Sequence, residues 1–359
     1  MIHDICFTTE WLDQKKKELK GVDPGLLEKA LHAFALLGHL AERELKFVFK
    51  GGTSLLLHVP VVRRLSIDID ILCSAPAEEL DRILTEIATV KPFVRYEESV
   101  RGERGLPNRR HFKFFYNPLV AGMREPYVLL DVVEEPEVPH DVIVKPITPN
   151  ILEIRREIPV TIPTIESLLA DKLTAFAPRT TGVPFVPNNG KSADTMQIVK
   201  QLFDVGELFN LAEDLTAVRR VYQKVFAQEN VYRGGGFTPA EALDDTIQAS
   251  LSLCMHTLKG VKETPEALML VDGARKLTSH LVDHRFNLDM AKIAAAKAAL
   301  MAKLIKNEAA SASLGAFKAI PPPEAIRQLK IEGEWERLNR LMSVNPEAFW
   351  CWYQASHLG

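Results

Sequence analysis

The stretch Lys50-Gly51-Gly52-Thr53-Ser54, followed by Arg64-Leu65-Ser66-Ile67-Asp68-Ile69-Asp70-Ile71-Leu72, decides the fold class of this chain. The second segment reads as a β-strand that carries two carboxylates, Asp68 and Asp70, in an apolar run. On a strand, residues i and i+2 point to the same face, roughly 6.6 Å apart. Unpaired buried charge is costly, so two anions on one face need a cation. Mg²⁺ takes one or two carboxylates together with substrate phosphates. The pattern therefore predicts a metal site for nucleotide chemistry.

A glycine turn precedes this pair of carboxylates. Residues 47–49 read as a short strand that leads into the turn, and a helix follows it. Glycines let the backbone approach an anion closely, and free N–H groups at the start of a helix favour phosphate. An ordinary tight turn is the alternative for a lone glycine pair. Because a carboxylate pair lies on the next strand, we expect the turn to contact phosphates, through Gly51, Gly52, Thr53 and Ser54.

A third carboxylate, Asp131, lies in the apolar run 127–133, which also reads as a strand. With Asp68 and Asp70 it would complete a two-metal cluster. One ion would activate the attacking hydroxyl, and the other would hold the triphosphate and the leaving pyrophosphate. Asp131 would deprotonate or orient the acceptor hydroxyl. The alternative is a strand-end aspartate that caps a turn.

Three further polar residues are candidates for nucleotide binding: Arg64, Ser66 and Lys172. Arg64 would orient Asp68 or Asp70 or touch a phosphate, and the alternative is a solvated charge where the strand begins. Lys172 lies on an amphipathic helix and carries a point charge that suits a triphosphate. A surface pair with its neighbour Asp171 is the alternative.

The bulk composition describes a globular enzyme. With 359 residues, 47% hydrophobic and 25% charged, the chain can form two or three domains with a substantial core. Its net charge of −3 argues neither for nor against nucleic acid. The 4 cysteines are far apart in the sequence, which predicts reduced thiols and no zinc or disulfide framework. Without a signal-like N-terminus or an apolar run of membrane length, a cytoplasmic location is expected.

The order of elements predicts an α+β fold. Helices are expected in 8–45 and 76–89, and strands at 47–49, 65–73, 93–100, 111–116 and 127–133. After Pro163 nearly every segment reads as helical. We therefore expect a mixed-sheet domain with N-terminal helices over 1–162, and a helical domain over 163–359 that completes a nucleotide cleft.

Together these motifs resemble the minimal, polymerase beta-like nucleotidyltransferases, and specifically the AbiEii/AbiGii (MenT-like) toxin family of bacterial type IV-like toxin–antitoxin systems. The resemblance covers about residues 45–210 and runs through Lys50-Gly-Gly-Thr-Ser, Arg64-x-Ser66-x-Asp68-x-Asp70, Asp131, Leu169-Ala-Asp-Lys172-Leu and Lys200-Gln-Leu-Phe-Asp204-Val. It implies a nucleotidyltransferase fold with a helical second domain. It also implies that Asp204 is a catalytic or nucleotide-positioning acid. The family often has an acidic residue where this chain has Gln201.

The resemblance further implies a reaction and a partner. Family members transfer nucleotides from an NTP to the 3′ end of tRNA, which blocks aminoacylation, and they occur with a cognate antitoxin. One local feature supports RNA, because basic groups bind phosphate and aromatic rings stack on bases. Between residues 95 and 116 basic and aromatic residues interleave: Arg95, Tyr96, Arg101, Arg104, Arg109, Arg110, His111, Phe112, Lys113, Phe114, Phe115 and Tyr116. The alternative is that these aromatic rings form the core of a strand.

The resulting hypothesis is a Mg²⁺-dependent nucleotidyltransferase toxin with five catalytic residues: Asp68, Asp70, Asp131, Lys172 and Asp204. Two alternatives stay open. The nucleotide acceptor could be a protein or a small molecule such as an aminoglycoside, or the chain could be a non-catalytic binding protein on a nucleotidyltransferase scaffold. The complete set of three strand aspartates argues against the second alternative.

Overall fold

A computed structural model describes residues 1–99, 108–134, 137–187, 190, 192–308 and 313–358. The chain divides into two compact units. The first contains Met1–Thr164 and Ser279–Arg285, and the second contains Ile165–Thr278 and Phe286–Gly359. The sequence-based boundary at 162 and 163 did not include the return of Ser279–Arg285 to the first unit. Backbone hydrogen bonds hold this segment, with Leu65 N donating to His280 O (2.7 Å) and Val282 N donating to Arg63 O (2.9 Å).

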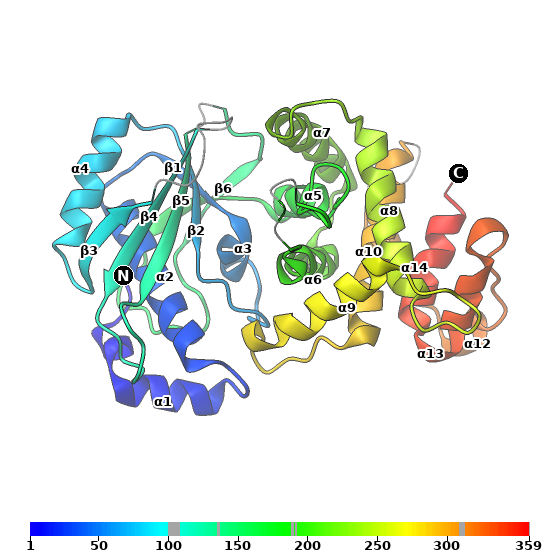
Figure 1. The fold of residues 1–359 in the computed structure, drawn as a ribbon, viewed down its shortest axis with the longest axis horizontal. Helices are drawn as coiled ribbons and strands as arrows, with labels where there is room; N and C mark the ends of the chain where they lie inside the picture. Colours follow the sequence, from blue (N-terminus) through cyan, green and yellow to red (C-terminus); the bar gives the residue numbers. More distant parts are fainter. Residues whose placement is uncertain (100–107, 135–136, 188–189, 191, 309–312, 359) are drawn as a thin grey trace. The chain divides into compact units, whose positions relative to one another are not determined.

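The first unit is built around a mixed sheet with the strand order β1-β2-β5-β4-β3. Strands β2 and β5 are parallel, and the other neighbouring pairs are antiparallel. Figure 1 shows how these strands lie side by side. Their bounds are β1 (Phe47–Lys50), β2 (Ile69–Cys73), β3 (Phe93–Glu98), β4 (Arg109–Tyr116) and β5 (Tyr127–Glu134).

Helices α2 (Pro24–Glu42) and α4 (Ala77–Ala88) pack on one face of this sheet (Figure 1). The Asp23 side chain caps α2 by accepting a hydrogen bond from Leu26 N (2.8 Å). Strand β5 alternates in burial, with Val128, Leu130 and Val132 buried against these helices and the residues between them partly exposed. One face of the sheet is therefore core, and the other carries the polar side chains. The remaining helices before β2 are η1 (Asp4–Phe7), α1 (Thr9–Glu18), α3 (Gly51–Ser54) and η2 (Leu55–Leu57).

Strands β6 (Val142–Pro146) and β7 (Pro159–Pro163) form a separate antiparallel hairpin. The residues of β7 lie close to β1, at the edge of the larger sheet. The sequence analysis did not predict either strand. Both are short, and β7 begins and ends with proline, which cannot donate to a ladder and so weakens the strand pattern.

The second unit is helical in the part that the structure describes. Its longest helix, α10 (Leu288–Lys306), is rich in buried alanines, which let neighbouring helices approach closely. A Cβ built on Gly206 of α6 would lie 2.9 Å from Ala294 Cβ, so only glycine fits this crossing. The other elements of this unit are α5 (Ile165–Ala175), α6 (Thr195–Leu211), α7 (Leu215–Tyr232), α8 (Pro239–Met255), α9 (Pro265–Leu277), α11 (Gly315–Lys318), α12 (Pro323–Ile326), η4 (Gly333–Arg340), α13 (Leu341–Val344) and α14 (Pro346–Ser356). Between α9 and α10 the short helix η3 (Thr278–His280) begins at the last residue before the boundary and continues into the segment of the first unit.

Two expectations about the whole chain can be compared with the described residues. All four cysteines are buried and free: Cys6, Cys73, Cys254 and Cys351. Within the described ranges, no helix has the length and apolarity needed to cross a membrane.

Candidate active site

The two carboxylates of the Asp-x-Asp motif do not share a strand. The strand expected over 65–73 begins only at Ile69, so Asp70 lies on β2 and Asp68 lies in the segment before it. Tertiary hydrogen bonds hold that segment out of the ladder, since Thr53 Oγ1 donates to Asp68 O (2.6 Å) and Leu65 N bonds to His280. The i, i+2 geometry assumed for this pair is therefore wrong.

Asp70 instead has a neighbour on another strand. It is the register partner of Asp131 on the parallel strand β5. Register partners point to the same face of a sheet, and neighbouring strands lie about 4.8 Å apart. Both aspartates are half-buried. Two carboxylates that are distant in sequence thus lie side by side on the open face of the sheet.

This pairing extends over two further strands. Lys50 on β1 is the partner of Asp70, and His111 on β4 is the partner of Asp131. His111 Nδ1 lies 2.5 Å from Asp131 Oδ1, with side chains 17% and 29% exposed. We name Lys50, Asp70, Asp131 and His111 the polar row.

The sequence analysis missed the role of His111 in this row and grouped it with a basic RNA surface. One signal was available, because β4 alternates between buried Phe112 and Phe114 and the half-buried His111 and Lys113. That alternation assigns His111 to the open face. It does not reveal that β5 is the neighbouring strand.

Gly51 makes room for the Asp70 carboxylate. Its φ of +78° favours glycine, and a Cβ at this position would lie 2.9 Å from Asp70 Cγ. The hydroxyls of the same turn are buried and used internally, with Thr53 bonded to Asp68 O and Ser54 Oγ donating to Gly51 O (2.8 Å). In this arrangement both hydroxyls donate within the protein, and the backbone around Gly51 and Gly52 is the part of the turn that could approach an anion.

The expected cluster of three carboxylates is not assembled. Across the described ranges, no group of three or more His, Cys, Asp or Glu side chains is arranged to hold a metal ion. Asp70 and Asp131 nevertheless fit one Mg²⁺ ion, because this ion takes one or two carboxylates and completes its shell with water and phosphate oxygens.

Arg64 and Ser66 lie in the segment that leads to Asp68. Arg64 is buried, its Nη1 donates to Leu65 O (3.1 Å), and its backbone forms a bridge with Leu281. It is therefore not a solvated charge at the beginning of a strand. Ser66 is half-buried.

Lys172 and Asp204 form a buried ion pair within the second unit. Lys172 Nζ on α5 lies 3.2 Å from Asp204 Oδ2 on α6, with side chains 8% and 1% exposed. The same ammonium donates to Gln201 Oε1 (3.0 Å). Asp204 is fully enclosed, and Lys172 is one of its partners. Gln201 supplies a neutral oxygen at the position where an acidic residue is frequent in the family.

The expected RNA surface loses most of its aromatic part, although Tyr96 is only half-buried. Three of the rings belong to the core, with Phe112 and Phe114 fully buried and Tyr116 2% exposed, and Phe115 lies under the Arg95 guanidinium. Phe112, Phe114 and Tyr116 cannot stack on bases, because the sheet and its helices enclose them.

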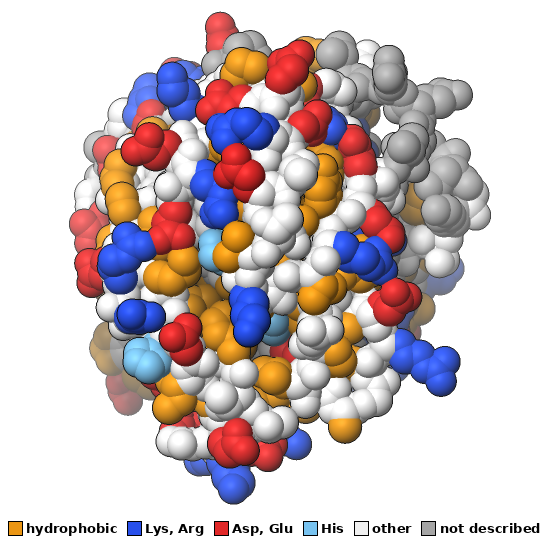
Figure 2. Space-filling view, turned by 90° about the vertical axis from the view of Figure 1, so that its left-hand side faces the viewer, with side chains coloured by type: hydrophobic (Ala, Val, Ile, Leu, Met, Phe, Trp, Pro, Cys, Tyr) orange, Lys and Arg blue, Asp and Glu red, His pale blue; other side chains and the backbone are white. Residues whose placement is uncertain are grey.

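The cations of the same segment are mostly paired. Arg95 contacts Glu97 and Glu125, and Arg110 Nε bonds to Glu98 Oε1 (2.8 Å). Arg101 and Arg104 lie outside the described residues. Figure 2 shows basic and acidic side chains intermixed on the face that it draws. The described residues of this segment thus provide no continuous basic surface.

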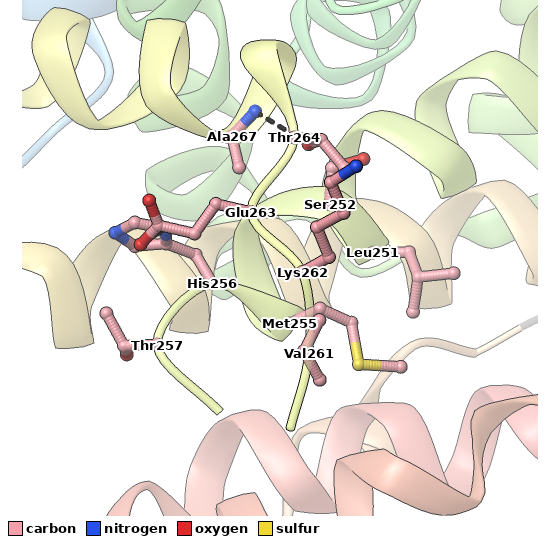
Figure 3. Close-up of a pocket in the computed structure, with 10 residues that line it drawn as sticks. All are labelled: Leu251, Ser252, Met255, His256, Thr257, Val261, Lys262, Glu263, Thr264 and Ala267. Carbon is pink, nitrogen blue, oxygen red and sulfur yellow. Dashed lines mark hydrogen bonds and ion pairs between the residues drawn. The ribbon is translucent and has the colours of Figure 1, made fainter. Parts of the chain in front are cut away.

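A cavity of about 180 Å³ lies in the second unit between the end of α8 and the beginning of α9 (Figure 3). Leu251, Met255 and Val261 supply apolar walls, and His256 Nδ1 lies 3.4 Å from Glu263 Oε1. None of the residues predicted from the sequence lines it.

Solved structures of other proteins are similar to this chain in fold. The solved structure of the nucleotidyltransferase toxin MenT4 from Mycobacterium tuberculosis aligns over 96% of this chain and 98% of its own, with a TM-score of 0.53 and 14% identity. JHP933 from Helicobacter pylori aligns over 79% of this chain and 93% of its own, with a TM-score of 0.41 and 15% identity. The search of curated proteins found no match.

The fold is that of a nucleotidyltransferase, with a mixed sheet and many helices. The family model described as nucleotidyl transferase AbiEii toxin, type IV toxin–antitoxin system, matches residues 35–301. The chain belongs to this family, and it is therefore a nucleotidyltransferase of the toxin class.

Proposed function

We propose that this protein transfers a nucleoside monophosphate from an NTP to the 3′-terminal hydroxyl of tRNA in a Mg²⁺-dependent reaction, and that this transfer blocks translation. The observation that supports nucleotidyl transfer best is the register pairing of Asp70 with Asp131 beside the glycine backbone at Gly51. The choice of tRNA as acceptor rests on the family resemblance.

In this proposal the polar row acts on the acceptor hydroxyl and the metal. Asp70 and Asp131 would hold Mg²⁺, and the bound ion would neutralise phosphate charge and favour the ionised hydroxyl. Asp131 orients the hydroxyl and receives its proton, and the freed oxygen bonds to the α-phosphorus as pyrophosphate leaves. The hydrogen bond from His111 fixes the carboxylate of Asp131 in one orientation.

The remaining candidates bind the nucleotide. Backbone N–H groups at Gly51 and Gly52 approach the phosphates. Asp68, in the segment before β2, would add a carboxylate ligand for a metal ion that carries the triphosphate. Lys172 neutralises triphosphate charge while Asp204 holds its ammonium. A titration with Mn²⁺ in the presence of a non-hydrolysable NTP measures whether one or two ions bind.

The first test measures transfer of label from each of the four α-labelled NTPs to total tRNA with Mg²⁺. Asp70→Asn and Asp131→Asn keep the side-chain shape and remove the charge, so we expect each to lower the rate about 100-fold or more. Asp13→Asn, at an exposed position of α1, is the matched control and should keep the wild-type rate.

Each outcome of this test decides one part of the proposal. Label that appears on protein or on a small molecule and not on tRNA would overturn the acceptor while keeping nucleotidyl transfer. Equal activity of wild type and Asp70→Asn would overturn the site. NTP binding without transfer to any acceptor would favour the non-catalytic alternative.

The second test addresses the block in translation. Induced expression of the wild-type chain should stop growth and the incorporation of labelled methionine, and Asp70→Asn should do neither. Continued methionine incorporation during growth arrest would contradict a block in translation.

A further inference from the structure

The outer strand of the β6–β7 hairpin exposes an unusual run of aliphatic side chains. Val142, Ile143 and Val144 are 43%, 36% and 67% exposed. Within the residues that the structure describes, β6 forms a ladder only with β7. An exposed apolar strand at the edge of a sheet is a template for pairing with another chain.

The edge strand β3 at the opposite side of the larger sheet is protected in the usual way. It carries charges at Arg95, Glu97 and Glu98 and has a single strongly exposed aliphatic residue, Val94, at 50%. Charged side chains on an edge strand disfavour pairing. The two edges therefore differ, and only β6 has the composition of an interface.

The ladder between β6 and β7 determines which backbone groups face outward. Thr164 N donates to Asp141 O (2.9 Å), and Ile147 N donates to Ile158 O (2.9 Å), so odd-numbered residues of this segment face β7. Alternate residues of an antiparallel strand direct their N–H and C=O groups to opposite edges. The N–H and C=O groups of Val142 and Val144 consequently point to the outer edge.

The sequence of β6 and its flank is complementary to itself in antiparallel orientation. With Ile143 on a two-fold axis, Val142 lies opposite Val144 of the second copy, and Asp141 lies opposite Lys145 of the second copy. The two Val142–Val144 pairs expose their backbone groups to each other and can form hydrogen-bonded pairs. Opposite charges across strands stabilise the pairing.

The pairing is compatible with the contact that Lys145 already makes. Lys145 Nζ donates to Leu57 O (3.2 Å), and an ammonium has three donors, so it can also bond a carboxylate. Pro146 is also turned outward but has no N–H, which limits the ladder to the Val142–Val144 core.

We propose that two copies of this chain associate through β6, which pairs with itself in antiparallel register about Ile143 and joins the two hairpins into one sheet. The occupant of this edge is a second copy, because the register that pairs Val142 with Val144 also places Asp141 opposite Lys145 at both ends of the pairing. Other extended peptides lack this constraint and would leave the purified chain monomeric.

A cysteine scan tests the register directly. At a non-hydrogen-bonded pair the two Cα atoms lie about 4.5 Å apart, within the range of a disulfide. Ile143→Cys should therefore form a disulfide-linked dimer of the full chain under mild oxidation. Val144→Cys alone should not, but it should cross-link when mixed with Val142→Cys. The native cysteines are buried and should give no background.

Sedimentation of the unmodified chain and of surface variants provides the second measurement. We expect a dimer at micromolar concentration, complete loss of that dimer in Val144→Lys, and no loss in the matched control Val94→Lys. Asp141→Lys should also dissociate the dimer, because it opposes Lys145, and Asp141→Lys with Lys145→Asp should restore it.

Circular dichroism and thermal melting of each variant separate dissociation from misfolding, because a folded monomer is the expected product. A wild-type chain that stays monomeric at all concentrations would overturn the proposal. A dimer that persists in Val144→Lys, or one cross-linked by Val144→Cys and not by Ile143→Cys, would also overturn it. These outcomes are independent of nucleotidyl transfer.

Discussion

His111 holds the carboxylate of Asp131 across two strands of the sheet, with Nδ1 2.5 Å from Oδ1. The two residues are register partners on β4 and β5, so the backbone ladder brings their side chains together. A carboxylate has two oxygens, and a bond to Oδ1 leaves Oδ2 able to accept another ligand. This contact orients the aspartate that we assign to the acceptor hydroxyl.

Removing this contact should impair turnover more than nucleotide binding. Loss of a group that orients a metal ligand typically lowers activity or metal affinity by about 10–100-fold. We expect His111→Ala to lower kcat by about that factor with little change in KM for NTP. His111→Asn, whose amide can still donate to Asp131, should retain more activity.

The control variant for His111→Ala is Lys113→Ala, because Lys113 lies on the same face of β4 as His111. It should leave kcat close to the wild-type value. Steady-state kinetics of the three variants, together with Mn²⁺ affinity measured by electron paramagnetic resonance, check this prediction. Equal kcat for His111→Ala and wild type would contradict a positioning role.

Replacing Gly51 by alanine should lower the unfolding free energy by more than the cost of its left-handed backbone conformation. A left-handed conformation costs a non-glycine residue about 1–2 kcal/mol. Gly21, with φ +81°, has open space where a Cβ would lie, whereas the Cβ of Gly51→Ala would meet Asp70. Urea unfolding should therefore show a larger loss for Gly51→Ala than for Gly21→Ala, and only the first should abolish transfer.

The buried pair of Lys172 and Asp204 should be sensitive to loss of one partner. Because Asp204 has a side chain only 1% exposed, Asp204→Asn leaves an ammonium buried without its counter-charge. Breaking such a pair typically costs about 3–5 kcal/mol of unfolding free energy. The double variant Lys172→Met with Asp204→Leu should be more stable than Asp204→Asn.

An exposed pair provides the comparison for this measurement. Lys330 and Glu332 are 65% and 81% exposed, so Glu332→Gln should change the unfolding free energy by less than about 0.5 kcal/mol. If Asp204→Asn lowered the unfolding free energy as little as Glu332→Gln in chemical denaturation, the ion pair would not stabilise the packing of α5 against α6.

Acid should destabilise the first unit through His32. Burial lowers the pKa of His32 to about 4 from 6.5, and its ring stacks on Tyr116 with centroids 3.6 Å apart. Between these two values the unfolded chain binds a proton that the folded chain does not. Unfolding free energy should therefore fall as pH drops from about 6.5 to 4, by about 3 kcal/mol.

The control for this pH dependence is a variant that cannot titrate. His32→Phe keeps an aromatic ring beside Tyr116 and should flatten the stability profile over that interval. Chemical denaturation at several pH values measures both profiles, and an unchanged slope in His32→Phe would assign the acid sensitivity to another group.

Local patterns in the sequence predicted the α+β class, the strands that carry Asp70 and Asp131, and the helix that carries Lys172. These patterns suffice because hydrophobic periodicity and helix caps act over a few residues. The AbiEii family was also recognisable from its motifs, and the family model bears it out. The strands β6 and β7 were not predicted, because both are only 5 residues long and prolines stand at their ends.

The tertiary structure alone decided which polar groups meet. The order β1-β2-β5-β4 brings Lys50, Asp70, Asp131 and His111 into one row, although they come from four separate segments. In the same sheet β2 begins after Asp68, and the aromatic rings of β4 are buried in the core. Strand order and register depend on long-range hydrogen bonds and on burial of one face, and a local pattern contains neither. The sequence thus determined which chemical groups this nucleotidyltransferase has, and the pairing of its strands determined which of them lie together.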